Sequence, residues 1–503
     1  MRISKHRAYA AAFLLGFIVR AVPEAIGYPA PIGYNVVAYY APAIAYFGVG
    51  DIMKLFHTPQ FSPLVYLLMM PFVRIASPYT VLAVFSPVLH GFLALAVYKF
   101  LRTEEFTARV ALFGSLFVVT QFPVLRLSWD MLSELLAVSI GVLALLLLRA
   151  RSYSPRRSLV LGSMLVLAGL AHQIVLVSLL PCVCYKAFKS GRTANTKTAI
   201  VLLSAILPSV LFLGWNWRFL QNAPEAFPIA PGVKLWFLNT ISSSTGISPF
   251  ANYITQFGSY QRTLVTVIGF LTFLYVPLLP ALVKRRRKSS FMMAWALILL
   301  LMAAGPVLYP NFALDLWYLW AITLSIPAWL MAFPGFAELL RRARVRKGGI
   351  LLVLLIISPY AAISVGFMAR PPESPFIYFS GSSFLAYSPS SMLSNTVSLQ
   401  DSFDALKLLA SLNMTMDQKS VLLVHEAFYG FAALSITGDK NIIDYLLGKP
   451  TDGLALANQL GFTRIYWVWW LPGYEWHDYQ APLRLFKPIL QSGHVAIFLY
   501  SPS

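Results

Sequence analysis

Charged side chains gather just outside several apolar segments, and one group of interest lies around residue 130. Asp130 ends the motif LRLSWD, with Arg126 one helical turn before it and Glu134 one turn after it. A carboxylate accepts the proton of a hydroxyl nucleophile, and an arginine matches the geometry of a phosphate leaving group. The pattern therefore favours transfer chemistry on a phosphate-bearing substrate.

Other side chains suited to binding also lie beside apolar segments. Arg20 and Glu24 end the first such segment, and Asn35 follows in the stretch PIGYNVVAYY. An amide such as Asn35 hydrogen-bonds a substrate hydroxyl but cannot take its proton. An aromatic face such as Trp217 stacks on a sugar or an isoprenoid. The further candidates for binding phosphate, sugar or acceptor are Arg218, Tyr39, His57, His172 and Gln173.

Most of these residues also have a purely structural interpretation. Asp130, next to a predicted helix start, suits an N-cap. Arg20 suits an arginine that extends to lipid headgroups. Tyr39 and its neighbours suit an interfacial aromatic belt, and His172 suits a histidine satisfied by solvent or backbone. We expect His90, within FSPVLHGFLALA, to be neutral and paired inside a helix bundle.

The elements that must position these residues are membrane-spanning helices. The chain has 503 residues, of which 58% are hydrophobic and 12% charged, whereas soluble domains carry about 25% charged residues. A net charge of +20 is explained by cytoplasmic lysines and arginines, so nucleic acid is not an expected partner. Apolar runs long enough to span a bilayer begin near Ala8, Tyr79, Val110, Met131, Ala199, Thr263, Phe291, Leu314 and Gly349.

The distribution of basic residues predicts the topology. Six basic clusters can all face the cytoplasm only if residues 61–76 do not cross and residues 158–187 enter and return as a pair of short helices. This predicts eleven crossings, with an uncleaved first span, a cytoplasmic N-terminus and an extracytoplasmic C-terminus. We assign the chain to the plasma membrane as an integral protein. The predicted outer segments are 23–78, 125–130, the tip near His172, 215–262, 308–314 and everything after about Met368.

The sequence divides into a multispan membrane domain, 1–368, with a long first outer loop at 23–78, and an extracytoplasmic domain, 369–503. The second domain alternates buried strand patterns with helical ones, which favours a small α/β domain with a mostly parallel sheet. Its strand patterns are FIYFS, SVLLVHE, NIIDYL, RIYWVWW and VAIFLYS, and its helical patterns are DSFDALKLLASL, EAFYGFAALSI, TDGLALANQLG and YQAPLRLFKPILQSG. A glycine-rich phosphate loop is missing, so nucleotide binding has no support.

Four motifs together resemble the GT-C superfamily of membrane glycosyltransferases. They are R-x-x-P…P-I-G-Y-x-x-x-x-Y from Arg20 to Tyr39, HTPQFSPLVYLL at 57–68, SWD at 128–130 and HQ at 172–173. The superfamily includes protein O-mannosyltransferases, aminoarabinose transferases and oligosaccharyltransferase subunits, and the C-terminal α/β tail is similar to archaeal-type members. WWDYG is absent, so the resemblance does not extend to oligosaccharyltransferase proper.

The resemblance implies transfer of a sugar from a polyprenyl or dolichyl phosphate to a glycan, lipid or protein acceptor at the outer face. The family position of Asn35 is usually Asp, so Asp130 or Glu24 would act as base and Asn35 would orient the acceptor. Arg126, Arg218 or Arg20 would hold the lipid phosphate, while His57, His172, Gln173, Tyr39 and Trp217 would contact sugar or acceptor. A divalent cation is an open alternative: Asp51 and Asp130 could hold one, although nothing in their spacing demands it.

Two other classes fit the same composition. A transporter or lipid flippase places ionisable groups near the bilayer midplane and is built from inverted repeats, whereas here only His90 is clearly mid-span. A non-catalytic scaffold derived from the enzymes fits Asn35, and it also fits Leu319 in LWYLW, where many family members carry an arginine.

Overall fold

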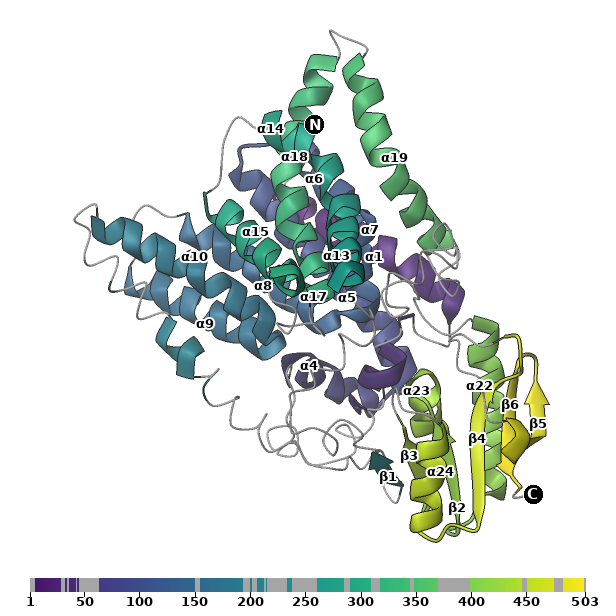
Figure 1. Cartoon of the computed structure of the whole chain (residues 1–503). Coiled ribbons are helices and arrows are strands. Elements are labelled where there is room, and N and C mark those ends of the chain that lie inside the picture. The colour runs from purple at the N-terminus through teal and green to yellow at the C-terminus, as the bar shows by residue number, and fades with distance from the viewer. Residues whose placement is uncertain are drawn as a thin grey trace.

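The computed structural model shows a large helical bundle joined to a small α/β domain (Figure 1). The two chain ends lie at opposite ends of the molecule, with the C-terminus in the α/β domain (Figure 1). The structure describes residues 5–28, 32–33, 36–41, 43–44, 63–149, 154–192, 200, 206–211, 214, 233–237, 260–284, 290–308, 317–343, 348–369, 399–445, 450–474 and 483–501.

The bundle contains long apolar helices. Four helices of the described chain are long and apolar enough to cross a membrane: His6–Gly27, Pro78–Thr103, Leu264–Val283 and Leu319–Arg341. The number rises to five if the bent pair Ala108–Val119 and Phe122–Trp129 is one span, and shorter apolar helices accompany them. These helices support a membrane protein, but the predicted count of eleven crossings is not confirmed.

The elements of the bundle are α1 (Lys5–Gly27), η1 (Val36–Tyr40), α4 (Pro63–Val73), α5 (Pro78–Thr103), α6 (Ala108–Val119), α7 (Phe122–Asp130), α8 (Leu132–Leu148), α9 (Pro155–Ala171), α10 (Gln173–Arg192), α13 (Tyr260–Tyr275), η3 (Val276–Leu278), α14 (Leu279–Lys284), α15 (Ser290–Ala303), α16 (Gly305–Leu308), α17 (Trp317–Thr323), α18 (Ser325–Ala343) and α19 (Gly348–Ala369).

Residues 61–76 and 158–187 form the kinds of helix that the predicted topology required. The first, α4, has 11 residues, which is about 16 Å of helix and too short for a bilayer core of about 30 Å. The second forms the two helices α9 and α10, which meet at His172 and lie side by side (Figure 1). His172 has an extended backbone, with φ of −162°, and this single residue separates the two helices.

The motif LRLSWD, which was predicted to lie at the outer face, is helical. It lies in α7, which starts with Pro123 in its first turn and bends by 65° from α6. A proline in the first turn is preorganised for a helix and loses no intrahelical hydrogen bond there. The helix ends where Met131 takes φ of −119° and ψ of 56°. A nine-residue helix between two spans has no periodicity of its own that would reveal it in the sequence.

Close packing of α1 against α5 depends on two glycines. A Cβ atom on Gly16 would lie 2.5 Å from the Cβ of Ala94, and one on Gly91 would lie 2.9 Å from the carbonyl oxygen of Phe13. Small residues let membrane helices approach closely in this way. His90, on α5, is fully buried with Nε2 3.0 Å from the carbonyl oxygen of Val119, so the expected pairing inside the bundle is confirmed.

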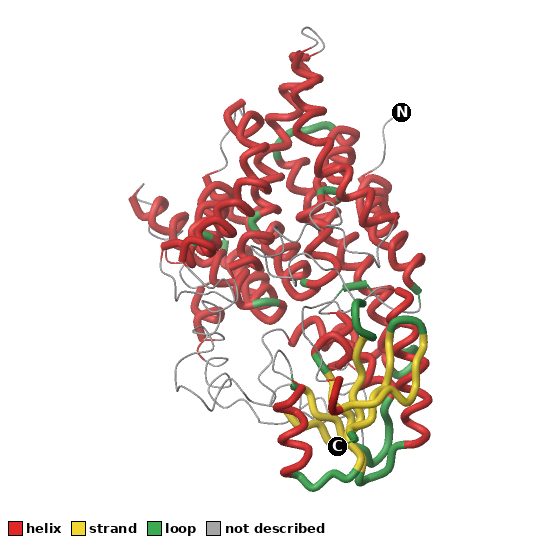
Figure 2. The backbone as a smooth tube through the Cα atoms, turned by 45° about the vertical axis from the view of Figure 1, so that its right-hand side comes forward, coloured by secondary structure: helices red, strands yellow, loops and turns green. Residues whose placement is uncertain are grey.

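The C-terminal domain is a six-stranded sheet in the order β1-β3-β2-β4-β6-β5 (Figure 2). The pairings β1–β3, β3–β2 and β2–β4 are parallel, and β4–β6 and β6–β5 are antiparallel, so a mostly parallel sheet is confirmed. The elements are β1 (Lys234–Phe237), α22 (Leu399–Thr415), β2 (Ser420–Val424), α23 (Glu426–Ser435), β3 (Asn441–Asp444), α24 (Pro450–Gln459), β4 (Arg464–Trp470), η5 (Leu483–Leu485), β5 (Phe486–Ser492) and β6 (Val495–Tyr500).

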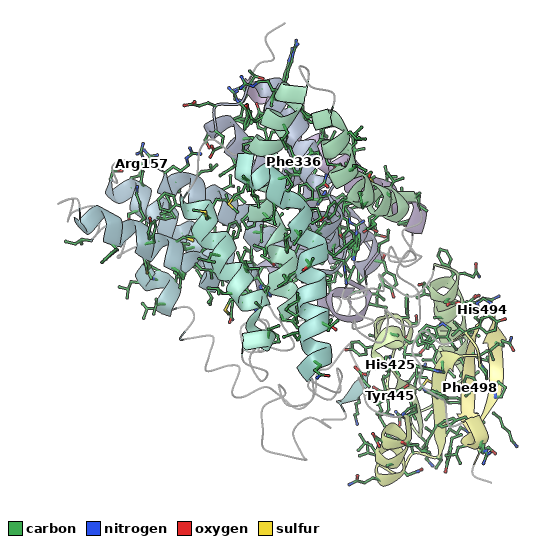
Figure 3. All side chains as sticks on the ribbon, turned by 45° about the horizontal axis from the view of Figure 1, so that its top comes forward. Arg157, Phe336, His425, Tyr445, His494 and Phe498 are labelled. Atoms are coloured by element: carbon green, nitrogen blue, oxygen red, sulfur yellow. The ribbon has the colours of Figure 1, made fainter. Side chains whose placement is uncertain are left out.

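Aromatic side chains fill the core of this domain. RIYWVWW forms β4 as predicted, and Trp467, Trp469 and Trp470 are buried. His425, at the end of β2, is also fully buried, with its ring 5.7 Å from that of Tyr445 and 5.3 Å from that of Trp469 (Figure 3). The core of the sheet therefore continues to the carboxyl ends of its parallel strands.

Two parts of the sheet differ from the prediction. YQAPLRLFKPILQSG was predicted as a helix, but its described part forms η5 and the strand β5, which pairs with β6 around a turn where Gly493 has φ of 53°. Pro488 is tolerated because β5 is an edge strand. The strand β1 was not predicted; it comes from the outer segment 215–262 and pairs with β3 at the other edge. The pattern FIYFS lies outside the described residues.

Candidate active site

A buried acid and histidine pair lies at the start of α8. Glu134 is in the first turn of α8 and 5% exposed, and its Oε1 atom lies 3.2 Å from Nε2 of His172. The extended residue between α9 and α10 carries this imidazole, so the helix break presents it to the neighbouring helix. A buried carboxylate needs a partner of this kind to offset its desolvation. The predicted hairpin tip and the predicted group of acids thus meet through Glu134.

Two tyrosines from the first outer segments border this pair. The hydroxyl of Tyr40, on η1, lies 2.6 Å from Oγ of Ser133 and accepts the Ser133 amide hydrogen at 3.1 Å. The ring of Tyr66, on α4, is 5.7 Å from that of Tyr40. Burial raises the pKa of Tyr40 well above its ordinary value, and the nearby Glu134 carboxylate raises it further. Both effects keep the Tyr40 phenol neutral beside the acid.

Asp130 is the last residue of α7, and a break at Met131 separates it from Glu134 in the first turn of α8. The N-cap of α8 is Met131, which makes no side-chain cap hydrogen bond, so the structural interpretation of Asp130 as that cap is wrong. The break between α7 and α8 lies one residue later than the sequence suggested, because α7 continues through Asp130. The Asp130 side chain itself lies outside the described residues.

Arg126 precedes Asp130 by one turn on α7 and is 2% exposed. Its guanidinium carbon lies 5.3 Å from the ring centroid of Trp129, within the range of a cation–π contact. An arginine held in this way is desolvated, and hydrogen bonds to an anion are stronger in such an environment. The placement of Arg126 therefore suits a phosphate contact near the same helix end.

Arg20 and Glu24 form a buried ion pair that ties the first outer loop to the bundle. Arg20 Nη2 lies 2.6 Å from Glu24 Oε1, and the two side chains are 0% and 4% exposed. Arg20 also donates to the Ser128 carbonyl at 3.2 Å and the Ile32 carbonyl at 3.4 Å. The Ile32 amide donates to Glu24 Oε2 at 3.3 Å. Arg20 does not extend to headgroups as the structural interpretation had it, because its partners lie inside the protein.

The predicted site residues thus separate into three groups. Arg20 joins Glu24, and His172 joins Glu134, with Gln173 next to it as the first residue of α10. Arg126 and the backbone of Asp130 form the third group, on α7. The remaining predictions fall outside the described residues: Asn35, His57, Trp217, Arg218 and the side chain of Tyr39.

Glu134, Tyr40, Tyr66 and Ser133 belong to the site but were not among the predicted site residues. The four-residue spacing of Glu134 from Asp130 was the available signal in the sequence. The roles of Tyr40 and Ser133 depend on a contact between η1 and α8 that no local pattern encodes. Within the ranges given above, His, Cys, Asp and Glu side chains nowhere gather in threes that could hold a metal ion.

The sequence matches no protein-family model, and no curated protein matches it. Among solved structures, it is similar to the oligosaccharyltransferase of Archaeoglobus fulgidus in complex with zinc and sulfate, with 11% identity over 91% of this chain and 67% of that chain and a TM-score of 0.48. A second structure of that protein, tethered by a disulfide bond to an acceptor peptide with the NVT sequon, gives 11% identity over 92% and 69% and a TM-score of 0.42. Likeness at this level carries no weight for function, which depends on the residues of the site.

Proposed function

We propose that this chain is a membrane glycosyltransferase that moves a sugar from a polyprenyl-phosphate donor to a glycan, lipid or protein acceptor at the outer face of the membrane. The observation that carries the proposal is the buried Glu134–His172 pair, which follows Asp130 across the break between α7 and α8 and is bordered by the neutral phenol of Tyr40. Two acids at adjoining helix ends, together with a desolvated arginine on α7, suit a reaction that moves a proton and releases a phosphate.

In the proposed reaction, an acceptor hydroxyl oxygen forms a bond to the anomeric carbon of the sugar. The bond from that carbon to the phosphate oxygen breaks, and its electron pair leaves with the polyprenyl phosphate. The proton of the acceptor passes to a carboxylate. Arg126 would stabilise the charge that develops on the leaving phosphate, with Arg218 as a further candidate.

Of the two predicted bases, we prefer Asp130 to Glu24. Both oxygens of Glu24 have partners, one in Arg20 and the other in the Ile32 amide. Glu134 is a second candidate for proton acceptor, or it orients His172 toward the acceptor. Asn35, His57, Gln173, Tyr39 and Trp217 remain proposed contacts for sugar or acceptor, and Arg20 supports the phosphate site indirectly by holding the Ser128 carbonyl of α7.

The test is release of polyprenyl phosphate from a total extract of lipid-linked sugars by the purified protein. We expect Asp130→Ala and Glu134→Gln each to lower the release rate by about 10²-fold or more, the usual contribution of a positioned acid or base. Glu104→Gln is the matched control, because Glu104 pairs with Arg149 at 2.7 Å at the other end of α8. Glu104→Gln should leave the rate unchanged.

Three outcomes would count against the proposal. Equal rates of polyprenyl phosphate release for the wild type and both acid variants would contradict the roles assigned to Asp130 and Glu134. Donor lipid that stays bound without turnover, detected by mass spectrometry, would indicate a scaffold derived from the enzymes. Movement of the intact donor across proteoliposomes without cleavage would indicate a flippase.

A further inference from the structure

The C-terminal domain contacts the segment that carries Tyr40. Helix α23 lies at the end of the domain next to the bundle (Figure 1) and packs against η1. The approach is close at Gly430, where a Cβ atom would lie 1.7 Å from the carbonyl oxygen of Val37 and 2.5 Å from its carbonyl carbon. Because the neighbouring atoms are backbone, any side chain at this position would force η1 or α23 to move.

A second contact fixes the same helix to α5. The Tyr79 hydroxyl donates to the Gly430 carbonyl at 3.5 Å, and its ring lies 6.4 Å from that of Phe431. Tyr79 is in the first turn of α5, so α23 rests on both a bundle helix and the first-loop segment. On its other side, η1 reaches α8 through the hydrogen bonds of Tyr40 to Ser133. The residue after Ser133 is Glu134.

We infer that the C-terminal domain positions the acid and histidine pair: docking of α23 through Gly430 holds η1 so that Tyr40 stays on Ser133 beside Glu134. Gly430 is then a positioning residue that acts through η1 and Tyr40. The inference rests on the proposed function for its effect on rate, but not for its effect on structure. A domain that only protected the bundle surface would need no backbone contact this close to the site.

The experiment compares Gly430→Ala with Gly453→Ala in the full chain. The matched control is on α24, where an added Cβ would meet its nearest atom at an ordinary 3.5 Å. We expect Gly430→Ala to speed hydrogen exchange of the Ser133 amide at least about tenfold, since Tyr40 would no longer accept it. We also expect kcat to fall about tenfold or more with KM for the donor nearly unchanged, because misplacement affects the chemical step. Gly453→Ala should change neither.

Tyr79→Ala is a second route in case Gly430→Ala does not fold. It removes the hydroxyl and ring contacts to α23 without adding an atom, and it should change Ser133 exchange and kcat in the same direction but less. Protection of the β4 amides serves as the control for folding of the domain. Unchanged Ser133 exchange in either folded variant would overturn the inference, whether or not the wild type turns over. Absent turnover in the wild type with faster Ser133 exchange in the variants would overturn only the proposed function.

Discussion

Arg20 and Glu24 carry opposite charges where water is excluded. Moving two charges out of water costs several kcal/mol for each ion, and their mutual attraction returns that cost only when the remaining hydrogen bonds are made. Here the Ser128 and Ile32 carbonyls and the Ile32 amide complete the set. The pair therefore specifies where the first loop and α7 meet.

Removing one member of this pair should cost more stability than removing both. We expect Arg20→Met to lower the free energy of unfolding by about 3–5 kcal/mol, because Glu24 is left as an unpaired buried charge. The double variant with Glu24→Leu should recover a large part of that loss. Denaturant unfolding in detergent micelles, read as a double-mutant cycle, measures the difference. Additive losses would contradict the role of the pair as a single unit.

At this scale the sequence indicates which residue types can do chemistry but not which of them meet. The turn-by-turn spacing of Arg126, Asp130 and Glu134 is visible in one line of sequence. The partner of Glu134 is His172, on a different helix pair, and the partner of Ser133 is Tyr40, in the first loop. Such contacts are set by how the helices pack.

Among the elements, α18 and α14 pack with backbone almost touching backbone. A Cβ atom on Gly335 of α18 would lie 1.8 Å from the carbonyl oxygen of Ala281 on α14. In contrast, Gly269 on α13 has no atom within 4 Å of the position where its Cβ would be. The two glycines therefore serve different purposes in otherwise similar apolar helices.

Substituting alanine at these two glycines should change stability in opposite directions. Gly335→Ala should lower the free energy of unfolding by about 1–3 kcal/mol, because the added methyl group forces the helices apart. Gly269→Ala should raise it by about 0.5–1 kcal/mol, since alanine is the better helix former and meets nothing. Thermal unfolding of both proteins in the same detergent tests this. A loss of stability in both variants would show that α13 is also tightly packed.

Elements with a long hydropathy pattern were predictable from the sequence. A short helix and a strand that joins a sheet from a distant part of the chain were not. The α1 and α5 spans, the α9–α10 pair and the strands β2, β3, β4 and β6 follow from hydropathy and alternation. Helix α7 was missed because it is short, and β5 was assigned as a helix because its apolar spacing fits either period. Nothing in the sequence near Lys234 reveals that its strand completes a sheet formed near the C-terminus.

For the whole molecule, the main prediction still open is which side of the membrane each end occupies. The distribution of basic residues places the C-terminal domain outside and the α18 end inside. The structure has these two parts at opposite ends of the bundle (Figure 1). If the proposed function is correct, the C-terminal domain lies on the outer side of the membrane, from which acceptors arrive.

Labelling with a membrane-impermeant maleimide tests this orientation. In a Cys184→Ser background, which removes the exposed native thiol, Met414→Cys should react in intact cells, since Met414 is 84% exposed on the C-terminal domain. Arg341→Cys, where the native side chain is 65% exposed at the end of α18, should react only after permeabilisation. The reverse pattern would invert the whole topology.

The strand β1 also imposes an order on biosynthesis. Lys234 pairs with Asn441, roughly 200 residues later, and contacts of such separation form late in folding. Until the last spans have been inserted and β3 has been translated, the segment that becomes β1 has no partner strand to pair with. When it joins, it covers the edge of β3, the kind of unpaired strand edge that otherwise recruits other chains. The sheet can therefore be complete only after the bundle has been inserted. A chain that stalls before that point would expose an unpaired strand edge to chaperones and proteases.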